Sequence, residues 1–163
     1  GNIGATNVNR LIGKKFGVIT LILDFLKTFC PCLIMHKYFG TEVGAASGFL
    51  TILGHMFPIW LKFKGGKGVA SYMGFMLATS WPLFIILITT WLFIVKIFKY
   101  SAVAAIISIL INLISFKMLL FSQFNYKILL WIKGDPIEFQ FILFISIIIL
   151  IKHYTNVINI FKK

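Results

Sequence analysis

Phe63-Lys64-Gly65-Gly66-Lys67-Gly68 lies between two strongly apolar runs of the chain. Its glycines allow the backbone to curl N–H groups around an anion, and its lysines add positive charge. Since the flanking runs are apolar enough to enter a bilayer, the stretch is predicted to lie at a membrane surface. The pattern indicates a site that holds a phosphate where a soluble substrate and a lipidic one meet.

The composition also points to the membrane. Of the 163 residues, 60% are hydrophobic and only 12% are charged, whereas soluble domains are about half apolar. A water-soluble fold of this length cannot bury so much apolar surface, so an integral membrane protein is predicted. No linker, repeat or low-complexity stretch divides the chain, and a single domain is expected across 1–163. The chain opens on Gly1-Asn2 without a signal-peptide pattern, and its true N-terminus is expected to be missing.

Six apolar runs predict an all-α, polytopic membrane helix bundle. They cover about 16–35, 44–61, 69–80, 83–95, 102–121 and 139–151. The third run is short, and Trp81-Pro82 marks a break after it, because proline suits the first turn of a helix better than its interior. The third and fourth helices are therefore expected to form a broken pair.

The basic residues predict which helix ends face the cytoplasm. One side of the bundle collects Arg10, Lys14, Lys15, Lys62, Lys64, Lys67, Lys96, Lys99, Lys152, Lys162 and Lys163. The other side has Lys37, Lys127 and Lys133 together with Glu42, Asp135 and Glu138. The richer side is assigned to the cytoplasm, which requires the third and fourth helices to form a hairpin. The net charge of +12 equally fits ordinary topology and contact with anionic lipid. No soluble basic domain is present to bind nucleic acid.

Three polar clusters fall on that richer side. The first is 1–10, in which Asn2, Thr6 and Asn7 can form hydrogen bonds and Arg10 can bind a phosphate through two N–H groups. A polar tail with a helix cap explains this composition equally well.

The second cluster runs from His55 through the glycine stretch to Ala70. It is not a Walker A loop, because Gly68 stands where a serine or threonine is needed. A glycine turn that leads into a helix N-terminus still favours anions through unpaired N–H groups and the helix dipole. An ordinary glycine- and lysine-containing membrane loop is the alternative.

The third cluster is His153-Tyr154-Thr155-Asn156, just after the last apolar run. On a continuing helix, His153 and Asn156 share a face and can bind one ligand together. A histidine at a membrane boundary is otherwise an ordinary interfacial residue. Because all three clusters lie on one side of the membrane, we expect them to converge on one site.

Asp24 and Lys27 are ionisable residues inside the first predicted span, where charge is costly. Their i, i+3 spacing favours mutual pairing over a separate functional role. Cys30 and Cys32 are too close in sequence for a good disulfide, and no cluster with metal-ligand spacing accompanies them.

The three clusters together resemble the motifs of the bacterial acyl-phosphate:glycerol-3-phosphate acyltransferases. The stretch 1–10 resembles the first motif. The stretch from Gly54-His55-Met56-Phe57-Pro58 through Lys64-Gly65-Gly66-Lys67-Gly68-Val69-Ala70 resembles the second, and His153-Tyr154-Thr155-Asn156-Val157 resembles the third. Asp24 and Lys27 also fit the family pattern. The motifs occur in order and cover nearly the whole chain.

This resemblance implies a seven-helix membrane fold with its motifs facing the cytoplasm, of which six helices are predicted here and the first is absent. The family motif starts with Gly-Ser ahead of the position of Gly1. It usually has arginine at the position of Asn159, and often at those of Lys14 and Lys99.

The implied reaction transfers a fatty acyl group from acyl phosphate to the 1-hydroxyl of glycerol 3-phosphate. Its products are lysophosphatidic acid and phosphate, at the start of phospholipid synthesis. The implied location is the bacterial inner membrane. Membrane lipids and the enzyme that makes acyl phosphate are the other implied partners, and no cofactor or metal is implied. The alternative is an inactive remnant of this enzyme, or a non-enzymatic membrane protein that binds or transports anions.

Site residues are assigned on the three motifs. Catalysis is expected of His153, Asn156, Lys67 and Arg10. Substrate or phosphate binding is expected of Asn2, Lys14, Lys64, Gly65, Gly66 and His55. Acyl phosphate is already activated, so direct attack by the glycerol hydroxyl is predicted, with the departing phosphate accepting the proton. General-base catalysis by His153 is the competing mechanism.

Overall fold

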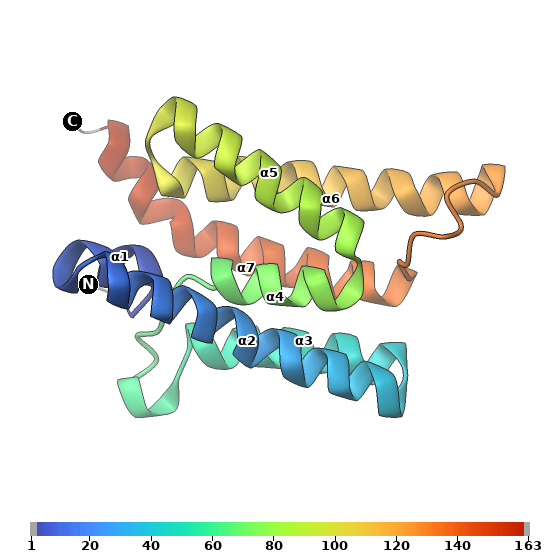
Figure 1. The fold of residues 1–163 in the computed structure, drawn as a ribbon, viewed down its shortest axis with the longest axis horizontal. Coiled ribbons are helices and arrows are strands. Elements are labelled where there is room, and N and C mark those ends of the chain that lie inside the picture. The colour runs from blue at the N-terminus through green and yellow to red at the C-terminus, as the bar shows by residue number, and fades with distance from the viewer. Residues whose placement is uncertain (1–2, 162–163) are drawn as a thin grey trace. The chain divides into compact units, whose positions relative to one another are not determined.

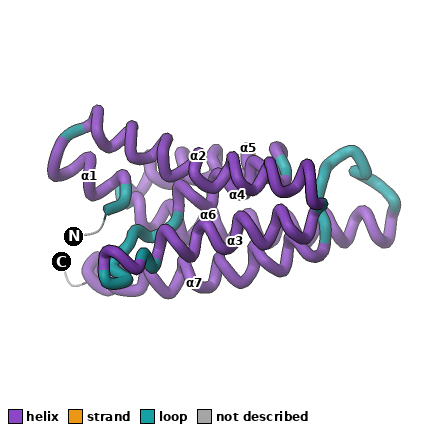
Figure 2. The backbone as a smooth tube through the Cα atoms, turned by 90° about the horizontal axis from the view of Figure 1, so that it is seen from below, coloured by secondary structure: helices purple, strands orange, loops and turns teal. Residues whose placement is uncertain are grey.

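The structure, a computed structural model, describes residues 3–161, and this part of the chain holds helices and loops but no strand (Figure 1, Figure 2). It divides into two compact units, Gly1–Ala78 and Thr79–Lys163, called unit 1 and unit 2 below. Unit 1 holds α1 (Ala5–Ile12), α2 (Lys14–Phe39), α3 (Thr41–Met56), the short 3₁₀ helix η1 (Ile59–Leu61) and all but the last residue of α4 (Val69–Thr79). Unit 2 holds α5 (Trp81–Phe98), α6 (Ser101–Tyr126) and α7 (Pro136–Phe161).

The predicted all-α, multi-pass membrane fold is confirmed. Each of the six predicted helices is present, as α2 to α7, and most extend beyond the apolar runs that predicted them. In the described residues, 5 helices are long and apolar enough to cross a membrane. Helix α4 has 11 residues, so its length of about 16 Å is too short to span a bilayer alone. Helix α1 was not expected, and the single domain across 1–163 stays a prediction.

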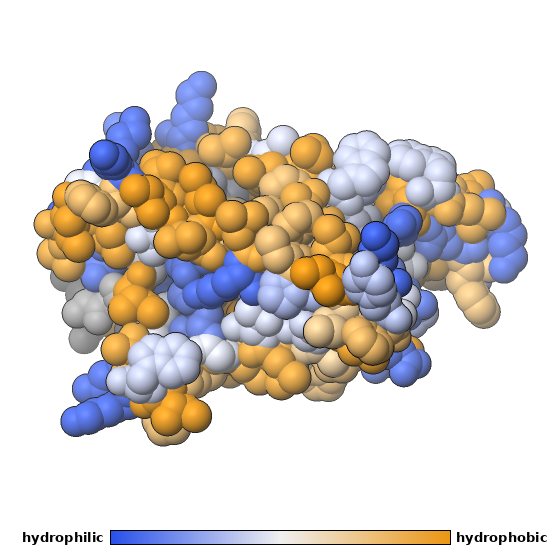
Figure 3. Space-filling view, turned by 60° about the horizontal axis from the view of Figure 1, so that its bottom comes forward, coloured by the Kyte–Doolittle hydropathy of each residue, from blue (hydrophilic) through white to orange (hydrophobic). Residues whose placement is uncertain are grey.

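Helix α2 is polar inside and apolar outside. Its buried residues are Gly17, Asp24, Thr28 and Cys32, which follow helical spacing along one stripe. Its exposed residues include Ile19, Leu21, Ile22, Leu23 and Leu26. Lipid tails provide the solvent for such a surface, while small and polar residues let helices approach closely and form hydrogen bonds. Figure 3 shows apolar side chains over much of the visible surface, as this solvent requires.

Glycines bring α3 and α4 against their neighbours in unit 1. Gly40 ends α2 with φ +89°, a conformation that side chains rarely adopt, and the chain reverses there into α3. A Cβ on Gly48 of α3 would overlap the Phe75 ring of α4. A Cβ on Gly74 would overlap the carbonyl oxygen of Phe25 in α2. Helix α4 is therefore held close to both α2 and α3.

The break predicted at Trp81-Pro82 is confirmed. Ser80 is extended, with φ −154° and ψ 110°, and Pro82 lies in the first turn of α5. Within unit 2, the buried Asn112 of α6 donates from Nδ2 to the carbonyl oxygen of Leu83 in α5 over 2.7 Å. This side chain binds a backbone group that lipid could not satisfy.

A capping box stabilises the N-terminal end of α7 in unit 2. The Asp135 carboxylate accepts from the Ile137 N–H over 2.8 Å, and the Glu138 carboxylate accepts from the Asp135 N–H over 3.0 Å. Pro136 occupies the first helical position, where its missing N–H has no cost.

Gly74→Ala tests the close packing of α4 on α2. The shift needed to accommodate the new Cβ beside Phe25 is expected to lower the free energy of unfolding by about 1–3 kcal/mol, although alanine is the better helix former. Gly54→Ala is the matched control, because a Cβ there meets nothing within 4 Å. Thermal unfolding in detergent micelles measures both variants, and equal midpoints would contradict the packing argument.

Candidate functional site

The glycine stretch forms a tight, largely buried turn between η1 and α4. Gly65, Gly66 and Gly68 are buried, whereas Lys64 is exposed. Gly68 has φ +84°, which favours glycine, and its carbonyl oxygen accepts the Tyr72 N–H over 2.7 Å. Gly68 therefore starts α4, and the N–H groups of the first turn after it have no acceptor within the helix. These groups give the turn its capacity for an anion.

Gly65 and Gly66 allow the turn to lie directly against His55. A Cβ on Gly65 would overlap the main-chain oxygen of His55, and a Cβ on Gly66 would overlap Nε2 of the His55 ring. The Gly66 N–H donates to the same His55 oxygen over 3.2 Å. The Gly66 N–H therefore already has an acceptor inside the protein, and the binding role expected of Gly66 stays a prediction.

Lys67 is the half-buried cation of the turn. Desolvation by burial lowers the pKa of its ammonium group from 10.5. A cation that has lost part of its water gains from a nearby anion, since the Coulomb attraction is stronger where water is excluded. Lys67 and the first turn of α4 flank Gly68, so both can act on one oxyanion.

His55 also belongs to an ionic cluster with Asp24 and Lys27, of which the sequence predicted only the Asp24–Lys27 pair. Lys27 Nζ lies 2.5 Å from Asp24 Oδ1, as the i, i+3 spacing predicted. It also lies 2.5 Å from His55 Nδ1, which is 28 positions away in the sequence. Asp24 Oδ1 is 3.4 Å from the same His55 nitrogen. The cluster joins α2 to α3 inside unit 1.

The N-terminal basic residues lie on α1 and the start of α2. Arg10 is exposed and donates from Nη2 to Asn7 Oδ1 over 2.8 Å. Helix α1 folds back on α2, because Gly17 lies directly against the backbone of Asn9. Lys14 is exposed in the first turn of α2. Asn2 lies outside the described residues.

In unit 2, His153 and Asn156 both lie on α7. The helix therefore continues past the last apolar run, as a shared face for these two residues requires. His153 is buried, and its Nδ1 lies 2.8 Å from the carbonyl oxygen of Ile149. A carbonyl oxygen can only accept, so Nδ1 carries the proton and Nε2 of a neutral ring is an acceptor. The side chain of Asn156 lies outside what the structure describes.

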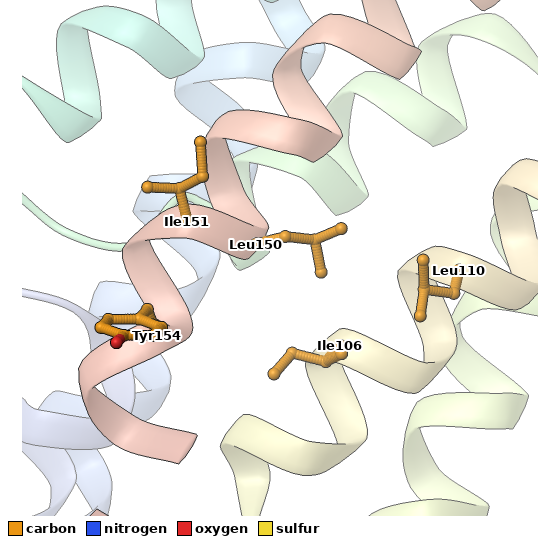
Figure 4. A pocket seen from close by; sticks show the side chains of 5 residues that line it. All are labelled: Ile106, Leu110, Leu150, Ile151 and Tyr154. Carbon is orange, nitrogen blue, oxygen red and sulfur yellow. The ribbon is translucent and has the colours of Figure 1, made fainter. Parts of the chain in front are cut away.

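An open apolar pocket of about 480 Å³ lies between α6 and α7. Ile106 and Leu110 line it from α6, and Leu150, Ile151 and Tyr154 line it from α7 (Figure 4). Its lining suits an alkyl chain and offers almost nothing to a polar group. Among the described residues, no group of three or more His, Cys, Asp or Glu side chains could hold a metal ion.

A family model described as glycerol-3-phosphate acyltransferase matches residues 1–163.

The chain belongs to the glycerol-3-phosphate acyltransferase family.

The curated relatives of this acyltransferase agree with that assignment. The glycerol-3-phosphate acyltransferase of Bartonella henselae is 38% identical over 162 residues, which are 96% of this chain and 70% of the relative. That of Brucella anthropi is 34% identical over 157 residues, which are 96% of this chain and 71% of the relative. The predicted family and acyltransferase activity class are thus confirmed.

Two solved structures resemble this acyltransferase. Both are crystal structures of PlsY (YgiH), described as an integral membrane glycerol 3-phosphate acyltransferase. The glycerol 3-phosphate form has a TM-score of 0.85 and 34% identity, and the match covers 99% of this chain and 76% of that one. The lysophosphatidic acid form has a TM-score of 0.84 and 34% identity, with 99% and 77% covered.

Burial of Lys67 predicts a pH-dependent stability of this acyltransferase. Because its pKa is lower in the folded protein than the ordinary 10.5, the burial cost is fully present below the folded pKa and disappears as pH rises toward 10.5. Lys67→Met is therefore expected to raise the unfolding midpoint at pH 7, with a gain that shrinks as the pH increases.

Lys64→Met is the matched control for this titration, since Lys64 belongs to the same turn and is exposed. Its unfolding midpoint at pH 7 is expected to stay close to that of the unchanged protein, because an exposed lysine has lost little of its water. Thermal scans between pH 7 and 11 compare the two variants, and a Lys67→Met gain that stays constant over this range would contradict the burial argument.

Proposed function

We propose that this acyltransferase transfers a fatty acyl group from acyl phosphate to the 1-hydroxyl of glycerol 3-phosphate, which gives lysophosphatidic acid and inorganic phosphate. The observation that carries this proposal is the buried glycine turn with Lys67 at the start of α4, because both substrates and one product carry phosphate. The PlsY structures support it, since their descriptions name a glycerol 3-phosphate form and a lysophosphatidic acid form.

The turn and the N-terminal segment supply the positive charge. Lys67 and Arg10 neutralise phosphate oxygens, and Lys64, Lys14 and Asn2 assist from the same motifs. Gly65 and Gly66 let the turn lie flat on His55, so that the N–H groups of the first turn of α4 face the anion. Positioning and electrostatic stabilisation then do most of the catalysis.

The chemical step needs no covalent enzyme intermediate. The glycerol hydroxyl oxygen attacks the carbonyl carbon of acyl phosphate, and a C–O ester bond forms. The bond between that carbon and the phosphate oxygen breaks, and phosphate leaves with the electron pair. The hydroxyl proton passes to the departing phosphate. His153 and Asn156 hold the glycerol hydroxyls on α7.

A general-base role of His153 is the competing mechanism, and its protonation pattern keeps that role chemically available. With the proton on Nδ1, the neutral ring can accept a hydroxyl proton at Nε2. Direct proton transfer to phosphate predicts residual activity in His153→Gln and a pH–rate profile without a histidine-like step. The general-base mechanism predicts instead that His153→Gln is inactive and that the pH–rate profile of the unchanged protein shows a histidine-like step.

The multi-pass chain is proposed to reside in the bacterial inner membrane, with the glycine turn facing the cytoplasm. Lysines near the turn and near the ends of α5 and α7 support this orientation through the positive-inside rule. We also propose that 1–163 acts as a single integral-membrane acyltransferase domain.

A donor comparison with the protein purified in detergent micelles tests the proposed function. The purified protein receives radiolabelled glycerol 3-phosphate with palmitoyl phosphate, palmitoyl coenzyme A or palmitoyl acyl carrier protein. Lysophosphatidic acid and an equal amount of phosphate are expected with palmitoyl phosphate only, because phosphate leaves and is recognised at the turn. Product from a thioester donor but not from acyl phosphate would contradict the proposal. So would an acyl group trapped on any side chain.

A further inference from the structure

A part-buried ionic cluster in unit 1 contacts the glycine turn, and the mechanism above gives its charged groups no role. It consists of Asp24 and Lys27 on α2 and His55 on α3, and it lies within membrane-spanning helices. The Asp24 and His55 side chains are 12% and 3% exposed and that of Lys27 is 37% exposed, so the two partners of the ammonium group have lost most of their water. Burying an ion pair gives little net stability on its own, and the geometry of the cluster therefore calls for another explanation.

The distances fix which group carries each proton. An ammonium group can only donate, and Lys27 Nζ lies 2.5 Å from both Asp24 Oδ1 and His55 Nδ1. Nδ1 must then accept, so it carries no proton, and the neutral His55 ring carries its proton on Nε2. A cationic His55 would place two donors against each other across that contact.

His55 connects the ionic cluster to the glycine turn. Its Nε2 lies so close to Gly66 that no side chain fits at residue 66, and its main-chain oxygen accepts the Gly66 N–H. The ring therefore fixes one wall of the turn. A rotation or a change of tautomer at His55 would change both the position of the turn and the charge that it meets.

Asp24 connects the cluster to α4, the helix that follows the turn. Its main-chain oxygen accepts from Ser71 Oγ over 3.0 Å, and Ser71 lies in the first turn of α4. The turn is thus tied at Gly66 through His55 and at Ser71 through Asp24. Lys27 bonds to both of these partner residues.

We propose that Lys27 is a positioning residue for the phosphate site: its ammonium group, held by Asp24, fixes the Nε2–H tautomer of His55 and thereby the glycine turn that binds the phosphate of glycerol 3-phosphate. This inference rests on the proposed function of that turn. It assigns to Lys27 an effect on substrate binding without any contact with the substrate.

Kinetics separate positioning from chemistry. Replacing both charged groups in Asp24→Leu/Lys27→Met removes the Lys27 donor to Nδ1 and leaves neither member of the ion pair as an unpaired charge. We expect KM for glycerol 3-phosphate to rise about ten-fold or more, with kcat changed by less than about three-fold. The single variant Lys27→Met adds an unpaired buried carboxylate, so its unfolding midpoint is expected to fall further than that of the double variant.

Lys117→Met is the matched control, because Lys117 is also a lysine within a membrane-spanning helix. It lies in unit 2, 5.7 Å from the Phe139 ring. KM and kcat of this variant are expected to match those of the unchanged protein.

Nitrogen NMR of protein labelled in its 3 histidines reads the tautomer directly, and His55→Gln assigns the signal. The unchanged protein is expected to show a protonated Nε2 and an unprotonated Nδ1 at His55, and the double variant is expected to lose this preference. A proton on Nδ1 of the unchanged protein would overturn the proposal, whether or not the double variant folds. A folded double variant with unchanged KM would overturn it too.

The NMR spectrum of His55 and the dissociation constant of glycerol 3-phosphate can both be measured without catalytic turnover. If the unchanged protein forms no lysophosphatidic acid, the proposed function fails, and the double variant is compared by that dissociation constant instead. A ten-fold weaker constant together with the expected tautomer supports the positioning role. An unchanged constant overturns it.

Discussion

The contact between Gly66 and the His55 ring is the constraint on which the candidate site depends. No atom beyond the glycine hydrogens fits between them, so the backbone of the turn must follow the shape of the ring. Gly68 then needs a positive φ to start α4 in the available space. The position of Lys67 follows from both, because it lies between these two fixed glycines.

The membrane explains why polar groups gather inside this protein. Lipid tails cannot satisfy a hydrogen-bonding group, so several polar residues of α2, α6 and α7 turn inward, while many leucines and isoleucines face outward. Asp24, Asn112 and His153 are all buried in this way. In unit 1 this solvent effect gives rise to a fixed network of donors and acceptors beside the glycine turn. The same arrangement that satisfies buried charge also determines the shape of the turn.

The sequence predicted well those features that depend on neighbours along the chain. Six helices, the break at Pro82 and the pairing of Asp24 with Lys27 all follow from hydropathy, proline chemistry or i, i+3 spacing. Helix α1 was missed because it has only 8 residues and a mixed composition, so neither its length nor its hydropathy distinguishes it from a polar tail.

Features that depend on contacts between distant segments could not be predicted from the sequence. Lys27 and His55 are 28 positions apart on different helices, and no periodic pattern indicates that they meet. The direction of the Gly66 N–H also depends on the path of the turn in space. A glycine-rich stretch indicates that donors are available, but it does not indicate which of them already have an acceptor.

Equilibrium binding of glycerol 3-phosphate tests most directly whether the buried turn is a phosphate site. Isothermal titration calorimetry compares the unchanged protein with Lys67→Met and with Lys62→Met, an exposed lysine just before the turn. Loss of one charge-assisted contact in a partly desolvated site is expected to weaken binding by about ten-fold or more in Lys67→Met, with no change in Lys62→Met. Equal dissociation constants for all three proteins would contradict the account.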